Sequence, residues 1–265
     1  AGDPYPPIEA SLSGRRPTTA WIEPVLDRQV LPDDADPAER AVLRESIRLA
    51  FVSALQLLPP RQRAVLLLRE VLRWKADEVA QLLDTTVASV NSALQRARAA
   101  VDERVPEQSQ QETLRSLGDD EVRELVDRYV DAWERCDVDA VVAMLTEDAT
   151  IAMPPLASWY GGIEEVEVFL RTKPLSGEWR WCHRPAVANG QLAVGTYTWI
   201  EEAGTHVPFS LDVLTLDGDR IKEVTAFVVR PADTPDGYSR WPERAADPRR
   251  VESVFRRFGL PDHVD

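Results

Sequence analysis

The sequence predicts two folded domains of different classes. The first is an all-α domain of four helices with a helix-turn-helix, and the second is an α+β domain with helices on one face of a curved antiparallel sheet. The chain has 265 residues, 44% of them hydrophobic, which is enough to form two cores. Apolar residues recur at a spacing of three and four in the first half and at every second position in the second half. The pairs Asn189-Gly190 and Asp217-Gly218 separate the later runs and favour the tight turns of antiparallel hairpins.

Residues 1–35 are predicted to be an extended linker, because prolines recur there without helical periodicity. The helical domain is expected at residues 36–105. Its first helix ends at Pro59-Pro60, and its apolar residues at helical spacing are Leu43, Ile47, Ala50, Phe51, Ala54 and Leu58. A second helix is expected from about Arg61, and a third from Ala76 to Leu83.

The fourth helix, which follows the polar turn Asp84-Thr85-Thr86, has the composition of a DNA-recognition helix. At about 100° per residue, one narrow stripe is apolar and is formed by Val87, Val90, Leu94, Ala97 and Val101. Away from this stripe the side chains are small, polar or basic, and the candidates for DNA contact are Ser89, Asn91, Ser92, Gln95, Arg96 and Arg98. Such side chains allow approach to the major groove and can bond base edges or phosphates. Periodicity alone is equally consistent with a solvated face of an ordinary helix bundle.

A connector is expected at residues 106–117 and an α+β domain at residues 118–232. Two helices open this domain, one carrying Val122 to Trp133 and one from Val138 to Leu145, and another is expected from Ile163 to Arg171. The alternating runs that predict strands are Ala149–Met153, Trp179–Ala188, Gln191–Glu201, Val207–Leu216 and Arg220–Val229. The tail at residues 233–265 contains a short helix candidate and several large apolar residues, so it is expected to dock on the protein.

Three blocks of the helical domain stand at linked spacing: Leu58 to Arg69 (LPPRQRAVLLLR), Ala76 to Leu83 (ADEVAQLL) and Val90 to Arg98 (VNSALQRAR). Together they closely resemble region 4 of extracytoplasmic-function (ECF) sigma factors of the sigma-70 family. The resemblance implies a bacterial protein that reads the promoter −35 element and contacts the flap of the β subunit of core RNA polymerase. It also implies that Asn91, Ser92, Gln95 and Arg96 lie at the DNA. Asn91 and Gln95 replace the basic or aromatic residues often found there, so the promoter sequence stays open.

The stretch Ser11 to Pro24 (SLSGRRPTTAWIEP) resembles the linker of sigma factors that carry C-terminal extensions. No segment resembles the promoter-melting region 2 of the family. The chain is therefore expected to be a fragment that does not initiate transcription by itself.

In the α+β domain, the blocks Leu145 to Pro155 (LTEDATIAMPP), Trp159 to Gly162 (WYGG), Ala188 to Gly190 and Thr225 to Phe227 resemble the SnoaL-like cyclases and the wider cystatin-like cone fold. Cone folds of this kind commonly keep an apolar pocket, whose expected occupant here is a small hydrophobic ligand. Residues that either line such a pocket or fill a closed core are Met153, Trp159, Tyr160, Trp181, His183, Tyr197, Trp199, Phe209, Asp212 and Phe227.

Some proteins of that fold are enzymes that use an aspartate or histidine base in an apolar cavity. The candidates here are Asp148, His183 and Asp212, but the sequence does not place any two of them within hydrogen-bonding reach, and single acids on strands are more often solvated or satisfied, so catalysis is not expected. The histidines and the distant Cys136 and Cys182 lack metal-ligand spacing, so no metal or cofactor is expected and both cysteines are predicted to be reduced.

The net charge of −14 is divided unevenly along the chain. Residues 36–105 carry eleven Lys and Arg against nine Asp and Glu, a net charge of +2, so the remainder carries −16. Sigma factors with such an extension resemble a group in which the extra domain controls activity within the same chain, and the acidic balance fits a body that covers the basic recognition residues. Two other readings remain: a SnoaL-like small-molecule-binding protein or isomerase/cyclase-type enzyme, and an effector-binding helix-turn-helix repressor.

No run of eighteen apolar residues occurs, so a cytoplasmic protein without a membrane span is expected.

Overall fold

The computed structural model describes residues 23–26, 58–71, 74–102, 110–154, 156, 159–230 and 246–265. The chain divides into two units, one within Leu31–Ser109 and one formed by Gly2–Val30 together with Gln110–Asp265. Apart from Leu58, the first helix expected from the apolar spacing lies outside the described residues.

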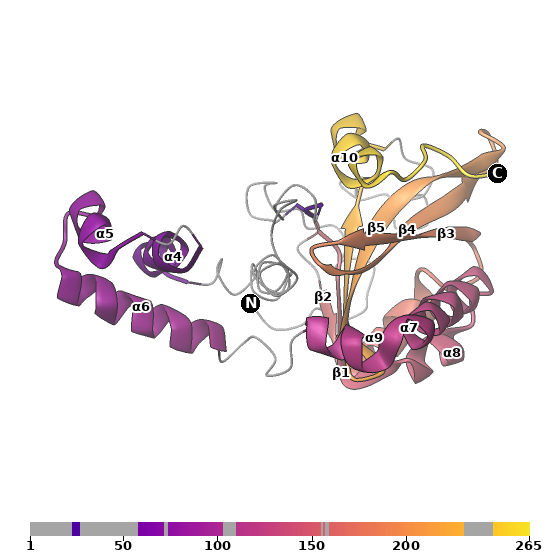
Figure 1. Ribbon diagram of the computed structural model, residues 1–265. Coiled ribbons are helices and arrows are strands. Elements are labelled where there is room, and N and C mark those ends of the chain that lie inside the picture. The colour runs from indigo at the N-terminus through magenta and orange to yellow at the C-terminus, as the bar shows by residue number, and fades with distance from the viewer. Residues whose placement is uncertain are drawn as a thin grey trace. The chain divides into compact units, whose positions relative to one another are not determined.

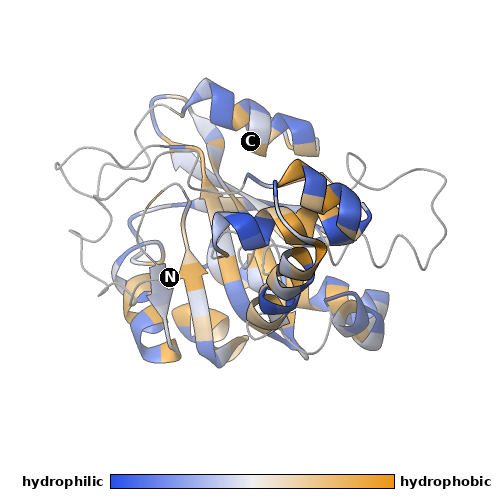
Figure 2. Cartoon of the chain, turned by 90° about the vertical axis from the view of Figure 1, so that its left-hand side faces the viewer, coloured by the Kyte–Doolittle hydropathy of each residue, from blue (hydrophilic) through white to orange (hydrophobic). Residues whose placement is uncertain are grey.

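The N-terminal unit consists of helices α4 (Pro60–Leu66), α5 (Ala76–Leu82) and α6 (Val87–Asp102), with a π-helical turn, η3 (Leu67–Val71), that continues α4. Pro60 suits the first position of α4, where its missing N–H has no helical partner to lose. The buried residues recur at helical spacing, so each helix has an apolar and a polar side (Figure 2). The core of this unit contains Leu58, Val65, Leu66, Val79, Ala80, Val90, Ala93, Leu94, Ala97 and Val101.

The C-terminal unit contains one six-stranded sheet in the order β2-β1-β6-β5-β4-β3. Its strands are β1 (Leu145–Ala152), β2 (Trp159–Gly161), β3 (Trp181–Ala188), β4 (Gln191–Ile200), β5 (Thr205–Asp217) and β6 (Arg220–Val228). Strands β3 to β6 form the antiparallel meander that the turn pairs predict. The sheet as a whole is mixed, because β1 pairs with β6 in parallel. β1 precedes the meander in the chain but pairs with the last strand of the meander, β6. No hairpin connects these two strands, so no tight turn requires them to be antiparallel.

Helices cover both faces of this sheet (Figure 1). On one side lie α7 (Gln110–Glu134), α8 (Val138–Ala143) and α9 (Ile163–Thr172). On the other lie α10 (Pro248–Val254) and the turn η5 (Arg256–Phe258) from the C-terminal tail, where the ring of Phe255 packs 5.2 Å from that of Tyr197. Burial of such an aromatic side chain contributes about 1.5–3 kcal/mol. The tail therefore acts as the second layer of the core.

The segment expected as a connector is helical from Gln110, where α7 begins, and belongs to the C-terminal unit. The buried amide of Gln110 donates to the carbonyl of Leu216 at 2.6 Å and accepts from the N–H of Leu216 at 2.8 Å. Gly118, with φ of 78°, breaks the helix at the point where composition predicts a new helix start. The polar composition of this segment suggested a solvated connector. The glutamines instead form hydrogen bonds with the backbone of the sheet and its turn.

Candidate functional site

The helix-turn-helix of the N-terminal unit is formed by α5, the turn Leu83 to Thr86, and α6. Asp84 takes the left-handed conformation at φ of 46°, which reverses the chain after α5. The hydroxyl of Thr86 accepts from the N–H of Ser89 at 3.1 Å, which satisfies one of the free donors at the start of α6.

The side chains of α6 divide sharply by burial. Val90, Leu94, Ala97 and Val101 are buried against the unit, whereas Val87 in the first turn is exposed. Ser89 is half-buried, and the exposed candidates for DNA contact are Asn91, Ser92, Gln95, Arg96 and Arg98. No acidic residue occupies the first turn of α6, so the positive end of its dipole is not neutralised there. We call Ser89 and the five exposed candidates together the α6 polar face. Their hydroxyl, amide and guanidinium groups suit contacts with phosphates and base edges.

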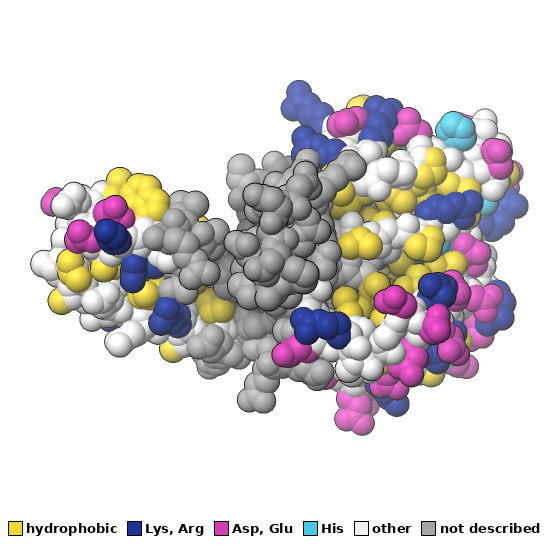
Figure 3. Space-filling view, viewed as in Figure 1, with side chains coloured by type: hydrophobic (Ala, Val, Ile, Leu, Met, Phe, Trp, Pro, Cys, Tyr) yellow, Lys and Arg dark blue, Asp and Glu magenta, His cyan; other side chains and the backbone are white. Residues whose placement is uncertain are grey.

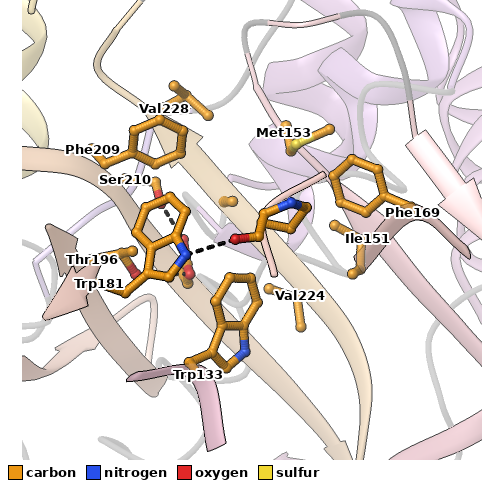
Figure 4. Close-up of a pocket in the computed structure, with 13 residues that line it drawn as sticks. Trp133, Ile151, Met153, Phe169, Trp181, Thr196, Phe209, Ser210, Val224 and Val228 are labelled. Carbon is orange, nitrogen blue, oxygen red and sulfur yellow. Dashed lines mark hydrogen bonds between the residues drawn. The ribbon is translucent and has the colours of Figure 1, made fainter. Parts of the chain in front are cut away.

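The C-terminal unit encloses a cavity between its sheet and the helices α7 and α9 (Figure 4). Its empty volume is about 450 Å³ when the part open to solvent is included. Trp133, Trp181 and Phe209 lie together on one side in Figure 4, with Met153, Phe169 and Ile151 on the other. The remaining lining residues are Pro174, Thr196, Ser210, Asp212, Val224, Ala226 and Val228.

The polar floor of the cavity is a group of three buried residues, Thr196, Ser210 and Asp212, which we call the Asp212 group. The hydroxyl of Ser210 donates to Oδ1 of Asp212 at 2.6 Å, and that of Thr196 donates to Oδ2 at 2.9 Å. Burial raises the pKa of Asp212, and the two hydroxyls and the nearby His183 only partly oppose that effect. Burial therefore favours the neutral form of Asp212 more than it would favour that of an exposed aspartate.

Further polar groups are buried beside this floor. The hydroxyl of Tyr129 and Nε1 of Trp133 have no hydrogen-bond partner among the described residues. Burial, and then the charge of Asp212, raise the pKa of Tyr129 well above its usual value, so Tyr129 stays neutral. Nδ1 of His183 lies 3.5 Å from Oε1 of Glu134, and the contacts with His183 lower the pKa of that carboxyl.

The turn between β3 and β4 holds both segments that flank the N-terminal unit in the chain. Asn189 and Gly190 both have positive φ, 56° and 67°, as a type I′ turn requires. The N–H of Val25 donates to Oδ1 of Asn189 at 3.0 Å, and the N–H of Asn189 donates to the carbonyl of Val25 at 2.9 Å. On the downstream side, the amide of Gln111 donates to the carbonyl of Gly190 at 2.7 Å. We call Asn189 and Gly190 the anchor turn.

A partly buried ion pair supports the upstream segment. Arg250 of α10 donates to Oε1 of Glu23 at 2.8 Å and to the carbonyl of Val228 at 2.7 Å. The side chain of Arg250 is 7% exposed and that of Glu23 is 41% exposed, so solvent weakens the pair from one side. Residues 23–26 are thus part of the C-terminal unit although they precede the N-terminal unit in the chain.

Comparison with known proteins agrees with these two architectures. A family model described as sigma-70, region 4 matches residues 48–101, and one described as SnoaL-like domain matches residues 126–224. The chain carries sigma-70 region 4 and a SnoaL-like domain. Region 4 contains the helix-turn-helix, and the SnoaL-like domain contains the Asp212 group.

Similar proteins combine the same parts. The chain is 38% identical to the ECF RNA polymerase sigma factor SigG of Mycobacterium tuberculosis over 99% of its own length, and it spans 64% of the length of SigG. It is 31% identical to SigJ of the same organism over 134 residues, which is 50% of this chain and 40% of SigJ. The crystal structure of SigJ matches with a TM-score of 0.52 at 23% identity, covering 91% of this chain and 76% of that one. The chain is therefore a relative of the ECF sigma factors.

In the SnoaL-like domain, the residues suggested by the sequence are spread over several surfaces. Met153, Trp181, Phe209 and Asp212 line the cavity. Tyr160 stacks on Phe169 and His183 lies behind Trp133, whereas other candidates pack elsewhere: Trp159, Tyr197, Trp199 and Phe227. Asp148 is exposed, 3.3 Å from Lys222, and the hydroxyl of Thr146 lowers its pKa. Asp148 therefore lies apart from the cavity, whereas His183 and Asp212 are near enough for their charges to interact.

Sequence reasoning missed Trp133, Thr196 and Ser210. The sequence spacing could have indicated Ser210, because residues two apart on a strand face the same side and Ser210 precedes Asp212 by two on β5. Thr196 lies opposite Ser210 on β4.

The described residues contain no group of three metal-ligating side chains placed for a metal ion, and both cysteines there are free. Among those residues, no helix is both long and apolar enough to span a bilayer. Asp and Glu side chains gather over α7 and α8 of the SnoaL-like domain (Figure 3).

Proposed function

We propose that this chain is the promoter-reading and regulatory part of an ECF sigma factor, which would act in the bacterial cytoplasm. Region 4 binds the −35 element of promoter DNA and the flap of the β subunit of core RNA polymerase, and the SnoaL-like domain controls this activity in the same chain. The observation that carries the proposal is the α6 polar face, which is exposed within the segment matched by sigma-70 region 4.

DNA recognition is tested by selecting sequences from a random duplex library with the 265-residue chain and then measuring affinity by fluorescence anisotropy at a fixed salt concentration. We expect one sequence to be enriched and Arg96→Ala to weaken its binding about tenfold, because contacts to bases contribute about 1–3 kcal/mol each. Arg123→Ala removes an exposed arginine of the SnoaL-like domain and serves as the charge-matched control. An equal loss for Arg123→Ala would contradict the assignment to α6.

Contact with RNA polymerase separates a sigma factor from a repressor. The chain, immobilised, should capture a purified flap domain of the β subunit, whereas an effector-binding repressor needs no such contact. Failure to retain the flap domain under conditions where the selected DNA still binds would favour the repressor.

Regulation within the chain is supported by the anchor turn and by the acidic balance outside region 4. Because Val25 and Gln111 are both held by this turn, region 4 is tethered at its two ends to the SnoaL-like domain. Asn189→Gly keeps a residue that accepts positive φ but removes the Oδ1 acceptor of Val25. We expect it to raise the DNA affinity of the 265-residue chain several-fold, with Val187→Ala, an exposed position two residues earlier, unchanged. Equal affinities for wild type and Asn189→Gly would argue against control through this turn.

We also propose that the SnoaL-like domain regulates without catalysing. The support is the exposure of Asp148 outside the cavity and the occupation of both Asp212 oxygens by hydroxyl donors. Turnover of a carbonyl compound by the wild-type protein, lost in Asp212→Asn, would overturn this.

A further inference from the structure

The first turn of α6 exposes an apolar side chain that helical spacing had placed in the core. Val87 belongs to the predicted apolar stripe, yet its side chain is 43% exposed, whereas Val90 in the same stripe is fully buried. Ala88, the next residue, is exposed as well. The start of α6 therefore presents two neighbouring apolar residues to solvent.

This apolar pair adjoins the α6 polar face. Residues four apart on a helix are neighbours on its surface, so Val87 lies beside Asn91 and Ala88 lies beside Ser92. Asn91 and Ser92 are both exposed members of the α6 polar face. The pair thus continues the surface that is proposed to bind DNA.

Hydrogen bonds hold the first turn of α6 in place. The hydroxyl of Thr86 accepts from the N–H of Ser89 at 3.1 Å, and the carbonyl of Thr86 accepts from the N–H of Val90 at 3.0 Å. The side chain of Val87 is branched at Cβ and has few rotamers in a helix. A contact through its methyl groups therefore costs little conformational entropy.

The chemistry of the major groove decides what Val87 can contact there. In helix-turn-helix proteins, the N-terminal residues of the second helix approach the base edges. These edges carry hydrogen-bond donors and acceptors, and their apolar group is the C5-methyl of thymine. Valine cannot bond the donors or acceptors and would only shield them from water, which costs free energy. Contact with the methyl group instead removes apolar surface from water on both sides.

We propose that Val87 is a specificity-determining residue, which contacts the C5-methyl group of one thymine in the major groove of promoter DNA. Ala88 is small and lets the backbone of α6 approach the base. This inference rests on the proposed function of region 4 and deepens it, because it assigns one base preference to an apolar side chain beside the α6 polar face.

The test removes methyl groups from the DNA and from the protein in turn. Each thymine of the sequence selected with the 265-residue chain is replaced singly by deoxyuridine, which lacks only the C5-methyl, and affinity is measured by fluorescence anisotropy at a fixed salt concentration. We expect one replacement to weaken binding of the wild type about threefold to fivefold, the value of about one buried methyl group. Val87→Ala should lose a similar factor on the unmodified DNA and nothing further on that deoxyuridine DNA.

Two variants serve as controls. Val168→Ala removes an exposed valine of α9 in the SnoaL-like domain and should keep the wild-type sensitivity to deoxyuridine. Arg96→Ala should bind both DNAs more weakly but with the wild-type ratio between them, because its contact is a separate one. Thermal unfolding followed by circular dichroism should be nearly unchanged in Val87→Ala, since an exposed side chain contributes little to the core.

Several results would overturn the assignment of Val87. These are a selected sequence without thymine, a wild type insensitive to every replacement, and a Val87→Ala protein as sensitive as the wild type at the same thymine. If Arg96→Ala still weakens binding in these cases, DNA recognition by α6 stands and only the role of Val87 is wrong. Loss of flap-domain capture by Val87→Ala with unchanged DNA affinity would assign Val87 to the polymerase instead. A library without any enriched sequence would overturn the proposed function and this inference with it.

Discussion

Region 4 and the SnoaL-like domain use polar side chains in opposite ways. In region 4 the functional candidates lie on the outside of α6, and the buried residues there are almost all apolar. In the SnoaL-like domain the residues of the Asp212 group are buried, and near them the side chains of Tyr129 and His183 carry buried polar atoms without a hydrogen-bond partner among the described residues. This difference fits the proposed functions, in which the first domain binds DNA through its surface and the second controls that activity. Substitutions should therefore affect binding in one domain and stability in the other.

The largest expected effect on stability comes from the tail. Phe255 is fully buried between α10 and the sheet, so Phe255→Ala should lower the free energy of unfolding of the SnoaL-like domain by about 3–5 kcal/mol. Urea unfolding followed by tryptophan fluorescence measures this, since most described tryptophans lie in that domain. Phe258→Ala, at a half-buried position of the same tail, is the matched control and should cost less. Equal losses would mean that the tail packs loosely.

Asp212 should give the domain an unusual pH dependence. Its pKa is raised in the folded state, so the stability from its protonated form is complete below the unfolded pKa of about 3.9 and is lost as pH rises through the folded pKa. Asp212→Asn does not titrate, so its stability relative to wild type should increase with pH in that window, by about 1.4 kcal/mol for each unit of the shift. Urea midpoints at a series of pH values measure it. Asp148→Asn, where the pKa is lowered and the group is exposed, should show no such increase.

The smallest effect is expected in region 4. Thr86→Ala removes the hydroxyl that accepts from the N–H of Ser89 and should destabilise α6 by about 1 kcal/mol. Thermal unfolding followed by circular dichroism measures it, and Thr86→Ser, which keeps the acceptor, should behave as wild type. A loss in both variants would point to packing of the threonine methyl instead of capping.

The sequence predicted most helices and strands, but it did not predict which side chains of the sheet face the cavity. Alternation and the turn pairs located β3 to β6, because Asn189-Gly190 and Asp217-Gly218 end strands for a local reason. β2 was missed because three residues show no period, and the residues of β1 that pair with it lie seven to eleven positions away in the chain. Tyr197 and Phe227 were suggested for the pocket on account of their rings, yet the tail buries the opposite face of the sheet, so aromatic burial does not mark the cavity side. The glutamines at the start of α7 looked like linker residues because their bonding partner, Leu216, is more than 100 residues away.

The anchor turn also has a consequence for effective concentration. Val25 and Gln111, which precede and follow region 4 in the chain, are both hydrogen-bonded to this one turn of the SnoaL-like domain. A tether of this kind holds two binding partners at roughly millimolar local concentration. A covering contact too weak to form between separate proteins would then be populated within one chain, and promoter DNA at cellular concentrations would have to compete with it. Release of one end would leave region 4 tethered by the other end alone, so the volume that it samples would grow and that competition would weaken without a change in any proposed DNA contact.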